Sequence, residues 1–259
     1  SAQAPTPTPV ATAGVAEPSG ALDYDIANGH FYKQANGQGG AGETGFAVED
    51  AGLDGNGNTI KMGSGLQQLG GVAVLGYPIS RRFKNVPDDA FPYQAFQNGV
   101  LQWAPVSRSA RLANLMDELH DAGYDPTLEA MGYPRWQPDS SGGDYTAARR
   151  ERLSWLDDPS YADLKEYYFR SGPNPELVYG LPSAPPRTYG WIRVLRAQRF
   201  VFASYNNGPV VTALVGDAAK KLGQFSGEML TPQHPADTNL TAWMVKSAPA
   251  VAPAPVVYQ

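Results

Sequence analysis

The chain has 259 residues, 42% of them hydrophobic, which suffices to bury one sizeable core or two small ones. It has no cysteine, which excludes disulfide frameworks, thiolate metal sites and cysteine nucleophiles. Its net charge of −5 argues against nucleic acid as the main partner, because phosphate binding needs a basic face. The 28 glycines and 23 prolines predict an α+β fold that is β-rich, with tight turns and a few short helices.

Both ends of the chain are rich in Pro, Ala, Thr and Val and carry almost no charge. We expect residues 1–20 and 248–259 to be extended tails that flank a globular domain over 21–247. Thr6 and Thr8 lie between prolines and are candidates for O-glycosylation.

The first residues are small, as in the segment that remains after a secretory signal is cleaved. We therefore expect an extracellular or cell-surface protein whose signal peptide has been removed; the alternative is a trimmed intracellular protein. No apolar run approaches the roughly 20 residues of a membrane-spanning helix, so no membrane span is expected.

The N-terminal third of the domain reads as short strands between glycine-rich loops, with strands expected at 30–34 and 45–50. The stretch 73–79, "AVLGYPI", predicts a strand that ends in a turn. Asn98-Gly99 favours a type I′ turn, which predicts a hairpin that pairs Phe96 with Leu101 and Gln94 with Trp103.

Helices are expected mainly in an insert near 107–170. Residues 109–122 carry an apolar stripe with helical spacing, formed by Leu112, Leu115, Met116 and Leu119. Two further helices are predicted to begin at Asp144 and at Asp158-Pro159. The chain then returns to strands over 188–205 and 210–215, followed by a short helix over 216–223.

A Gly-x-Pro turn followed by a strand that carries glutamine occurs twice, and Gly132-Tyr133-Pro134 is a third, barer copy of the turn. Gly76-Tyr77-Pro78 precedes Gln97, and Gly180-Leu181-Pro182 precedes Gln198, which predicts strand-turn repeats near 66–105 and 176–205. The second copy has Phe200 in place of the turn glycine, so we expect a continuous strand there.

At these residues the chain resembles the LGFP-repeat proteins of bacterial cell surfaces and walls. Leu75-Gly76-Tyr77-Pro78 matches the motif with Tyr for Phe, and the Gln-x-Phe-x-x-Gly-x-x-x-Trp pattern follows at Gln94, Phe96, Gly99 and Trp103. The chain is also similar to exported Chloroflexi-type proteins of unassigned role. The resemblance implies a surface location and contact with wall glycan, and it carries over no catalytic residue.

Aromatic side chains, amides and arginines around the first repeat are candidate contacts for a glycan or a protein partner: Tyr77, Arg81, Arg82, Gln94 and Trp103. The alternative is that the aromatic residues fill the core and that the arginines cap carbonyls or cover a sheet edge. Further aromatic platforms for a sugar ring are Trp136, Trp155 and Trp191.

One loop has the ligand spacing of a cation site. Asp54, Asn56 and Asn58 place three oxygen ligands at alternate positions, as in calcium loops, although Gly65 stands where an EF-hand needs its glutamate. Calcium is therefore the candidate cofactor, with an Asx-rich turn as the alternative. The three histidines lie in no metal-ligand or nucleophile pattern.

These features predict a non-enzymatic, exported structural protein of the cell surface. We expect it to self-assemble into a polymer or filament with other copies, because both tails are uncharged and because acidic residues gather in 23–54 and arginines in 187–199. A wall-glycan binding module is the alternative. A hydrolase ranks last, since no acid–base or nucleophile set is recognisable.

Overall fold

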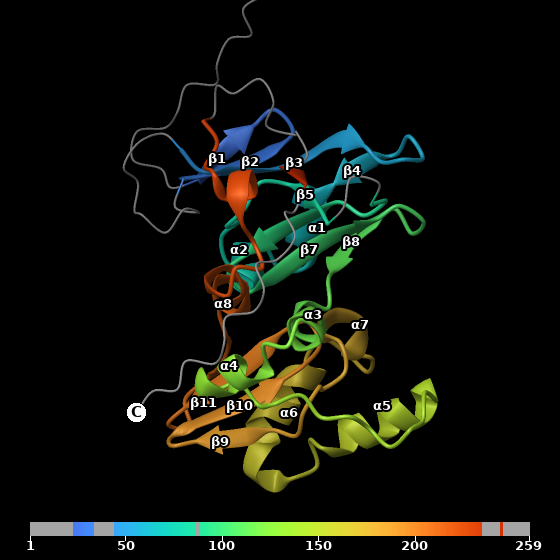
Figure 1. The fold of residues 1–259 in the computed structure, drawn as a ribbon, viewed down its shortest axis with the longest axis vertical. Coiled ribbons are helices and arrows are strands. Elements are labelled where there is room, and N and C mark those ends of the chain that lie inside the picture. Colours follow the sequence, from blue (N-terminus) through green and yellow to red (C-terminus); the bar gives the residue numbers. More distant parts are fainter. Residues whose placement is uncertain (1–22, 34–43, 86–88, 235–243, 246–259) are drawn as a thin grey trace, which may run out of the picture.

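The computed structural model describes residues 23–33, 44–85, 89–234 and 244–245. Three small sheets and several short helices make up this part of the chain, which confirms the α+β class (Figure 1). Both predicted tails, with Thr6 and Thr8, lie outside the described residues. No helix in the described ranges is long and apolar enough to cross a membrane.

The three sheets follow one another along the chain, except that the last strand, β13, returns to the middle sheet. The N-terminal sheet has the order β1 (Asp23–Ile26), β2 (Gly29–Tyr32), β3 (Phe46–Leu53) and β4 (Thr59–Lys61). The middle sheet has the order β13 (Met244–Val245), β5 (Phe83–Lys84), β6 (Tyr93–Phe96), β7 (Gly99–Ala104) and β8 (Ser109–Leu112). The C-terminal sheet has the order β12 (Val210–Thr212), β11 (Val201–Tyr205), β10 (Ile192–Arg196) and β9 (Arg187–Tyr189). All neighbouring strands are antiparallel except β13 and β5.

Short helices join and cover these sheets. Before the middle sheet lie α1 (Met62–Gln68) and α2 (Val72–Leu75). Between the middle and C-terminal sheets lie α3 (Leu115–Asp121), α4 (Asp125–Ala130), α5 (Tyr145–Ser154), the 3-10 turn η2 (Pro159–Tyr161), α6 (Ala162–Phe169) and α7 (Glu176–Tyr179). After the C-terminal sheet follow α8 (Val215–Lys221) and the 3-10 turn η3 (Gly227–Leu230).

Local capping signals place two helix starts where they are predicted. The Asp144 carboxylate accepts hydrogen bonds from the backbone N–H groups of Thr146 and Ala147 at the start of α5. Asp158 accepts one from Ser160 at the start of η2, which leads directly into α6.

Two predicted elements are wrong. The stretch 73–79 is not a strand, because its first residues complete α2 and the chain turns at Gly76. The Val74 and Leu75 carbonyls accept hydrogen bonds from Asn98, which hold this turn in place. Likewise, 109–122 is not one helix. Its first four residues form β8, which pairs Leu112 with Leu101 of β7, and the helix begins only at Leu115.

The predicted hairpin exists, but its register is wrong by two residues. Phe96 pairs with Gly99 and Gln94 with Leu101, so the tip is Gln97-Asn98. Neither Asn98 nor Gly99 has the positive φ of a type I′ turn. A slip of two residues keeps each side chain on its expected face, because side chains alternate along a strand.

The hairpin β10–β11 corrects the expectation of a continuous strand at Phe200. Arg196 pairs with Val201, and Ala197 N–H donates to the Phe200 carbonyl across a four-residue tip. The buried Phe200 ring lies 6.0 Å from that of Phe202, so burial explains the phenylalanine at this tip.

Two large apolar clusters use opposite faces of the middle and C-terminal sheets. In one, Trp103 and Phe202 join residues of α1 and α6; in the other, Ala95 and Val201 join α3 and α8. A buried ion pair lies beside the second cluster, where the Arg196 guanidinium donates to Asp125 at 2.8 Å.

The two Gly-x-Pro corners have the same geometry. Gly76 has φ 72° and ψ −174°, and Gly180 has φ 75° and ψ 170°. In each case the next backbone N–H donates to a glutamine side chain: Tyr77 to Gln97 Oε1 at 2.9 Å, and Leu181 to Gln198 Oε1 at 2.8 Å.

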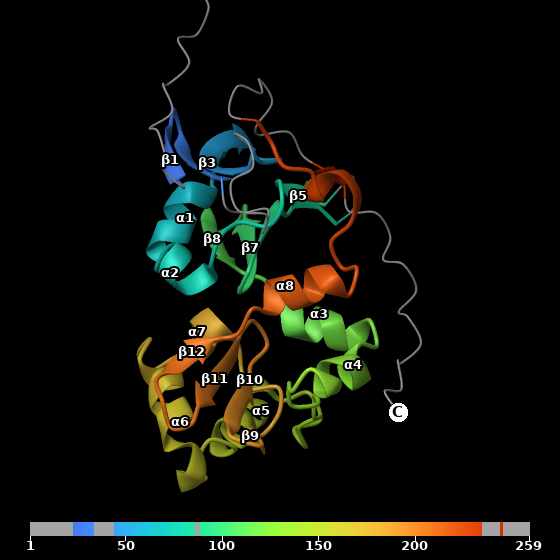
Figure 2. The ribbon, with the colours of Figure 1, turned by 90° about the vertical axis from the view of Figure 1, so that its left-hand side faces the viewer.

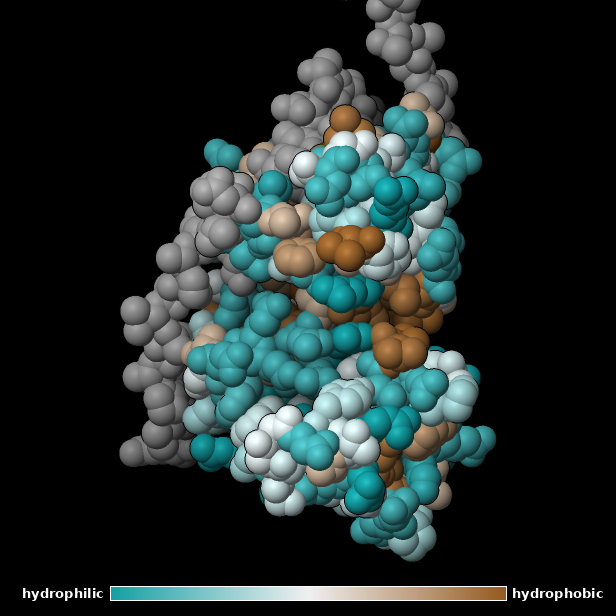
Figure 3. All heavy atoms as spheres, turned by 90° about the vertical axis from the view of Figure 1, so that its right-hand side faces the viewer, coloured by the Kyte–Doolittle hydropathy of each residue, from teal (hydrophilic) through white to brown (hydrophobic). Residues whose placement is uncertain are grey.

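The helix after each sheet docks on the corner of the other sheet. In α8, Gly216 N–H donates to the Gln97 carbonyl at 2.8 Å, and in α3, Met116 N–H donates to the Gln198 carbonyl at 2.9 Å. Gln198 Nε2 also donates to Asp117 of α3 at 2.7 Å. The two helices lie side by side at the waist of the molecule (Figure 2). On the face in Figure 3, hydrophobic residues gather near this waist.

Candidate functional site

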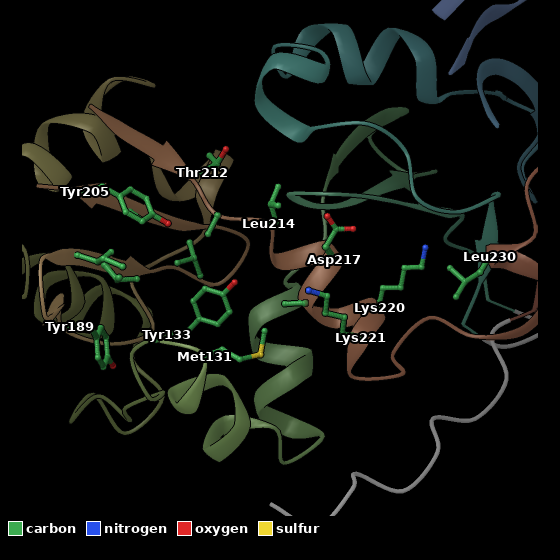
Figure 4. Close-up of a pocket in the computed structure, with 17 residues that line it drawn as sticks. Met131, Tyr133, Tyr189, Tyr205, Thr212, Leu214, Asp217, Lys220, Lys221 and Leu230 are labelled. Atoms are coloured by element: carbon green, nitrogen blue, oxygen red, sulfur yellow. The ribbon is translucent and has the colours of Figure 1, made fainter. Parts of the chain in front are cut away.

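A cavity of about 790 Å³ opens over one face of the C-terminal sheet (Figure 4). Strands β9 to β12 form its floor, and its walls come from α8, the segment after α4, and η3. The lining residues are Met131, Gly132, Tyr133, Tyr189, Ile192, Val194, Val201, Ala203, Tyr205, Thr212, Ala213, Leu214, Asp217, Ala218, Lys220, Lys221 and Leu230. We call this cavity the cleft.

Strand alternation explains which side chains form the floor. Ile192 pairs with Tyr205 and Val194 with Ala203, so these four share one face. The alternate residues, such as Phe202, face α6 on the other side.

The corresponding face of the middle sheet is filled. There Phe225, which follows α8, packs against Phe83 with ring centroids 5.8 Å apart, and Met229 of η3 joins the same cluster. On the C-terminal sheet, small side chains such as Ala203 and Ala218 line the space instead. Among the described residues, no side chain packs on this face of the C-terminal sheet as Phe225 packs on the middle sheet, and the cleft is open there.

Three tyrosines supply the polar groups of the cleft floor and wall. Tyr205 and Tyr133 turn their hydroxyl ends toward the side of α8 (Figure 4). Burial is the main cause that raises the pKa of Tyr133 and of Tyr189, so both phenols stay protonated at neutral pH and can donate hydrogen bonds. The Tyr189 hydroxyl is buried and has no hydrogen-bond partner among the described residues.

An exposed aromatic pair borders the cleft. Trp191 is 59% exposed and lies against Tyr205, which is 44% exposed, with ring centroids 5.7 Å apart. The adjacent turn has Asn206 and Asn207 at positive φ, and Asn206 N–H donates to the Trp191 carbonyl at 3.0 Å. We call Trp191 and Tyr205 the aromatic platform.

Helix α8 supplies the charges. Burial raises the pKa of Asp217, whereas Lys220, Lys221 and a hydrogen bond from the Gln97 side chain act in the opposite direction. Among the described lining residues Asp217 is the only carboxylate.

Two of the predicted contact residues are buried. Trp103 is 1% exposed, and its indole N–H donates to Asp54 at 3.0 Å. Gln94 is fully buried, and its amide donates to the carbonyls of Ala47 and Ser80. Their prediction as glycan contacts is wrong, because burial leaves neither side chain open to a ligand.

The other predicted contacts serve the fold around the N-terminal and middle sheets. Buried Arg82 donates to the backbone carbonyls of Glu49 and Ala51, and Arg81 donates to the Thr231 carbonyl at 2.7 Å. The arginine pair thus caps carbonyls, as the alternative interpretation expects. Tyr77 is half-buried against Tyr32, with ring centroids 5.9 Å apart.

The loop with calcium-like spacing forms an Asx turn. The Asp54 carboxylate accepts hydrogen bonds from the backbone N–H groups of Asn56 and Asn58, the Asn58 amide and the Trp103 indole. These bonds, that of Trp103 first, lower the pKa of Asp54 to about 2. The loop therefore surrounds its carboxylate with N–H donors, and within the described ranges no three or more His, Cys, Asp or Glu residues group as metal ligands.

Of the residues that line or border the cleft, only Trp191 is among the contact residues predicted from the sequence. The available signal was the Gly190-Trp191 turn, opposite Tyr205-Asn206-Asn207, because an aromatic residue in a hairpin turn has little room to be buried.

Comparisons with protein-family models, curated proteins and solved structures found no match for this chain.

Proposed function

We propose that the protein is a non-enzymatic carbohydrate-binding module of the bacterial cell surface and that the cleft with its aromatic platform holds a wall glycan. The observation that carries this proposal is the exposed aromatic pair of Trp191 and Tyr205, whose rings are tilted by 55° to each other, at the border of a tyrosine-lined cleft.

The chemistry of the cleft suits a sugar chain. The apolar C–H face of a pyranose packs on an aromatic ring, while its hydroxyl groups need donors and acceptors such as the phenols of Tyr133 and Tyr205. The volume of about 790 Å³ falls within the range of roughly 300–1,000 Å³ that is usual for small-molecule sites.

The resemblance to LGFP-repeat proteins supports the surface location and the wall glycan as ligand. The matched Gly76 and Gly180 corners agree with a repeated unit, and in the described part of the chain the cleft lies over the second unit, near 176–205. Binding is therefore assigned to the second unit alone.

Retention of the full chain on purified bacterial cell wall tests this function. Trp191→Ala should weaken binding about 10-fold to 30-fold, because the loss of a large aromatic contact typically costs about 1.4–2 kcal/mol. Tyr145→Ala is the matched control, since Tyr145 is 61% exposed on α5, away from the cleft. If the intact protein is not retained, or if both variants bind equally, the proposal fails.

Self-assembly is the second candidate function, and the composition of the tails favours it. Residues 1–20 and 248–259 are Pro-rich, and aromatic-lined grooves bind Pro-rich segments in the polyproline II conformation. The cleft would then hold a tail of another copy. Light scattering without glycan should in that case show assemblies that are lost both on deletion of residues 1–20 and 248–259 and in Trp191→Ala. A monomer at all concentrations would rule this function out.

A further inference from the structure

We propose that the glycan held in the cleft is acidic and that Lys220 and Lys221 bind its anionic groups; this inference rests on the proposed function. Both lysines lie in the last turn of α8 and line the cleft. Lys221 extends toward Met131 and Tyr133, whereas Lys220 lies on the side of Leu230 (Figure 4).

The charge of the lining is opposite to that of the chain. The protein carries a net charge of −5, yet the described lining has two lysines against Asp217 alone, and the remaining lining residues are uncharged. Because the chain as a whole repels an anion, a positive lining makes this cleft a favoured place for one to bind.

The lysines are also available to a ligand. Neither forms a salt bridge within the described ranges. Asp217 lies one turn earlier on α8, and its carboxylate accepts a hydrogen bond from the Gln97 side chain in the neighbouring sheet. Its backbone N–H also donates to the Gln97 carbonyl at 3.2 Å. Within the described ranges the fold thus holds Asp217 through Gln97, whereas the two lysines attract its carboxylate without forming a salt bridge with it.

The geometry gives the ligand two parts. The aromatic platform takes the apolar face of a sugar ring, and the ammonium groups on the opposite wall take a carboxylate or phosphate on the same chain. An ammonium is a compact point charge that suits a carboxylate as well as a phosphate. An experiment therefore has to decide which of the two groups the glycan carries.

Calorimetry on the full chain tests the inference with two matched pairs of probes. The first pair is oligogalacturonate, whose carboxylates are charged, and its methyl ester, in which the same groups are neutral. The second is a phosphorylated mannan oligosaccharide and its phosphatase-treated form. At low salt the wild type should bind at least one anionic probe about 5-fold to 25-fold more tightly than its neutral partner, because each partly exposed ion pair contributes up to a factor of about 5.

Lys220→Gln/Lys221→Gln should abolish this preference and leave the affinity for the neutral probe unchanged. The control Lys61→Gln/Lys165→Gln removes two positive charges outside the cleft and should keep the preference. The anionic probe with the larger preference identifies the group. If neutral and anionic probes bind equally, or if the preference survives in Lys220→Gln/Lys221→Gln, the inference is overturned while the proposed function stands. If no probe binds and the wall does not retain the protein, both are overturned.

Discussion

The corner at Gly180 provides a sharp test of how the fold is held together. Gly180 has φ 75° and ψ 170°, a region that only glycine adopts readily, so Gly180→Ala should cost about 1–3 kcal/mol in backbone strain. A Cβ there would also lie 2.5 Å from Gln198 Cβ. Moving Gln198 weakens its hydrogen bonds to Leu181 and Asp117, each worth about 1 kcal/mol.

The free energy of unfolding should therefore fall by about 3–5 kcal/mol, a large part of the roughly 5–15 kcal/mol typical of proteins. Urea denaturation followed by circular dichroism measures the loss. Gly123→Ala is the control: its φ is 81°, but a Cβ added there would have no atom within 4 Å, so it should cost only about 1–2 kcal/mol. A loss for Gly180→Ala no greater than that for Gly123→Ala would refute the reasoning.

Two further predictions concern buried or hydrogen-bonded carboxylates. The pKa of Asp54 is about 2 in the folded protein and near 3.9 when unfolded, so its contribution to stability is present above about pH 4 and is lost as the pH falls toward 2. The urea midpoint should therefore drop less between pH 5 and pH 2.5 in Asp54→Asn than in the wild type. Equal drops of the midpoint in the two proteins would contradict this. Asp125→Ala should lower the free energy of unfolding by about 3–5 kcal/mol, because it leaves the buried Arg196 charge without its carboxylate. Asp163→Ala, whose partner Arg193 is partly exposed, should cost under about 1 kcal/mol in the same assay; equal losses would show that burial does not set the cost.

Local signals predict helix starts and strand faces, whereas non-local contacts decide the register. Asp144 caps its helix through residues two and three positions away, so the sequence pattern contains the whole interaction. The tip at Asn98 is held instead by the carbonyls of Val74 and Leu75, more than 20 residues earlier. Turn preference alone therefore favoured the wrong pair of tip residues.

The cleft could not be predicted for a similar reason. Its Tyr133, Tyr205 and Asp217 come from three separate segments of the chain, and Phe225 packs on the middle sheet while the corresponding face of the C-terminal sheet stays open. Trp103 shows the opposite error, since a motif position typical of a contact residue is buried and donates to a loop carboxylate.

Each Gly-x-Pro corner binds the helix that follows the other sheet, and this arrangement constrains the order in which the chain can fold. Gln97 receives its α8 partner about 120 residues later, and Gln198 donates to Asp117 across a separation of 81 residues. When synthesis has reached residue 200, α8 has not yet been made, and the Gln97 carbonyl lacks its partner. Contacts this distant in sequence form slowly. We expect the two halves to be finished together, in one late step that waits for α8.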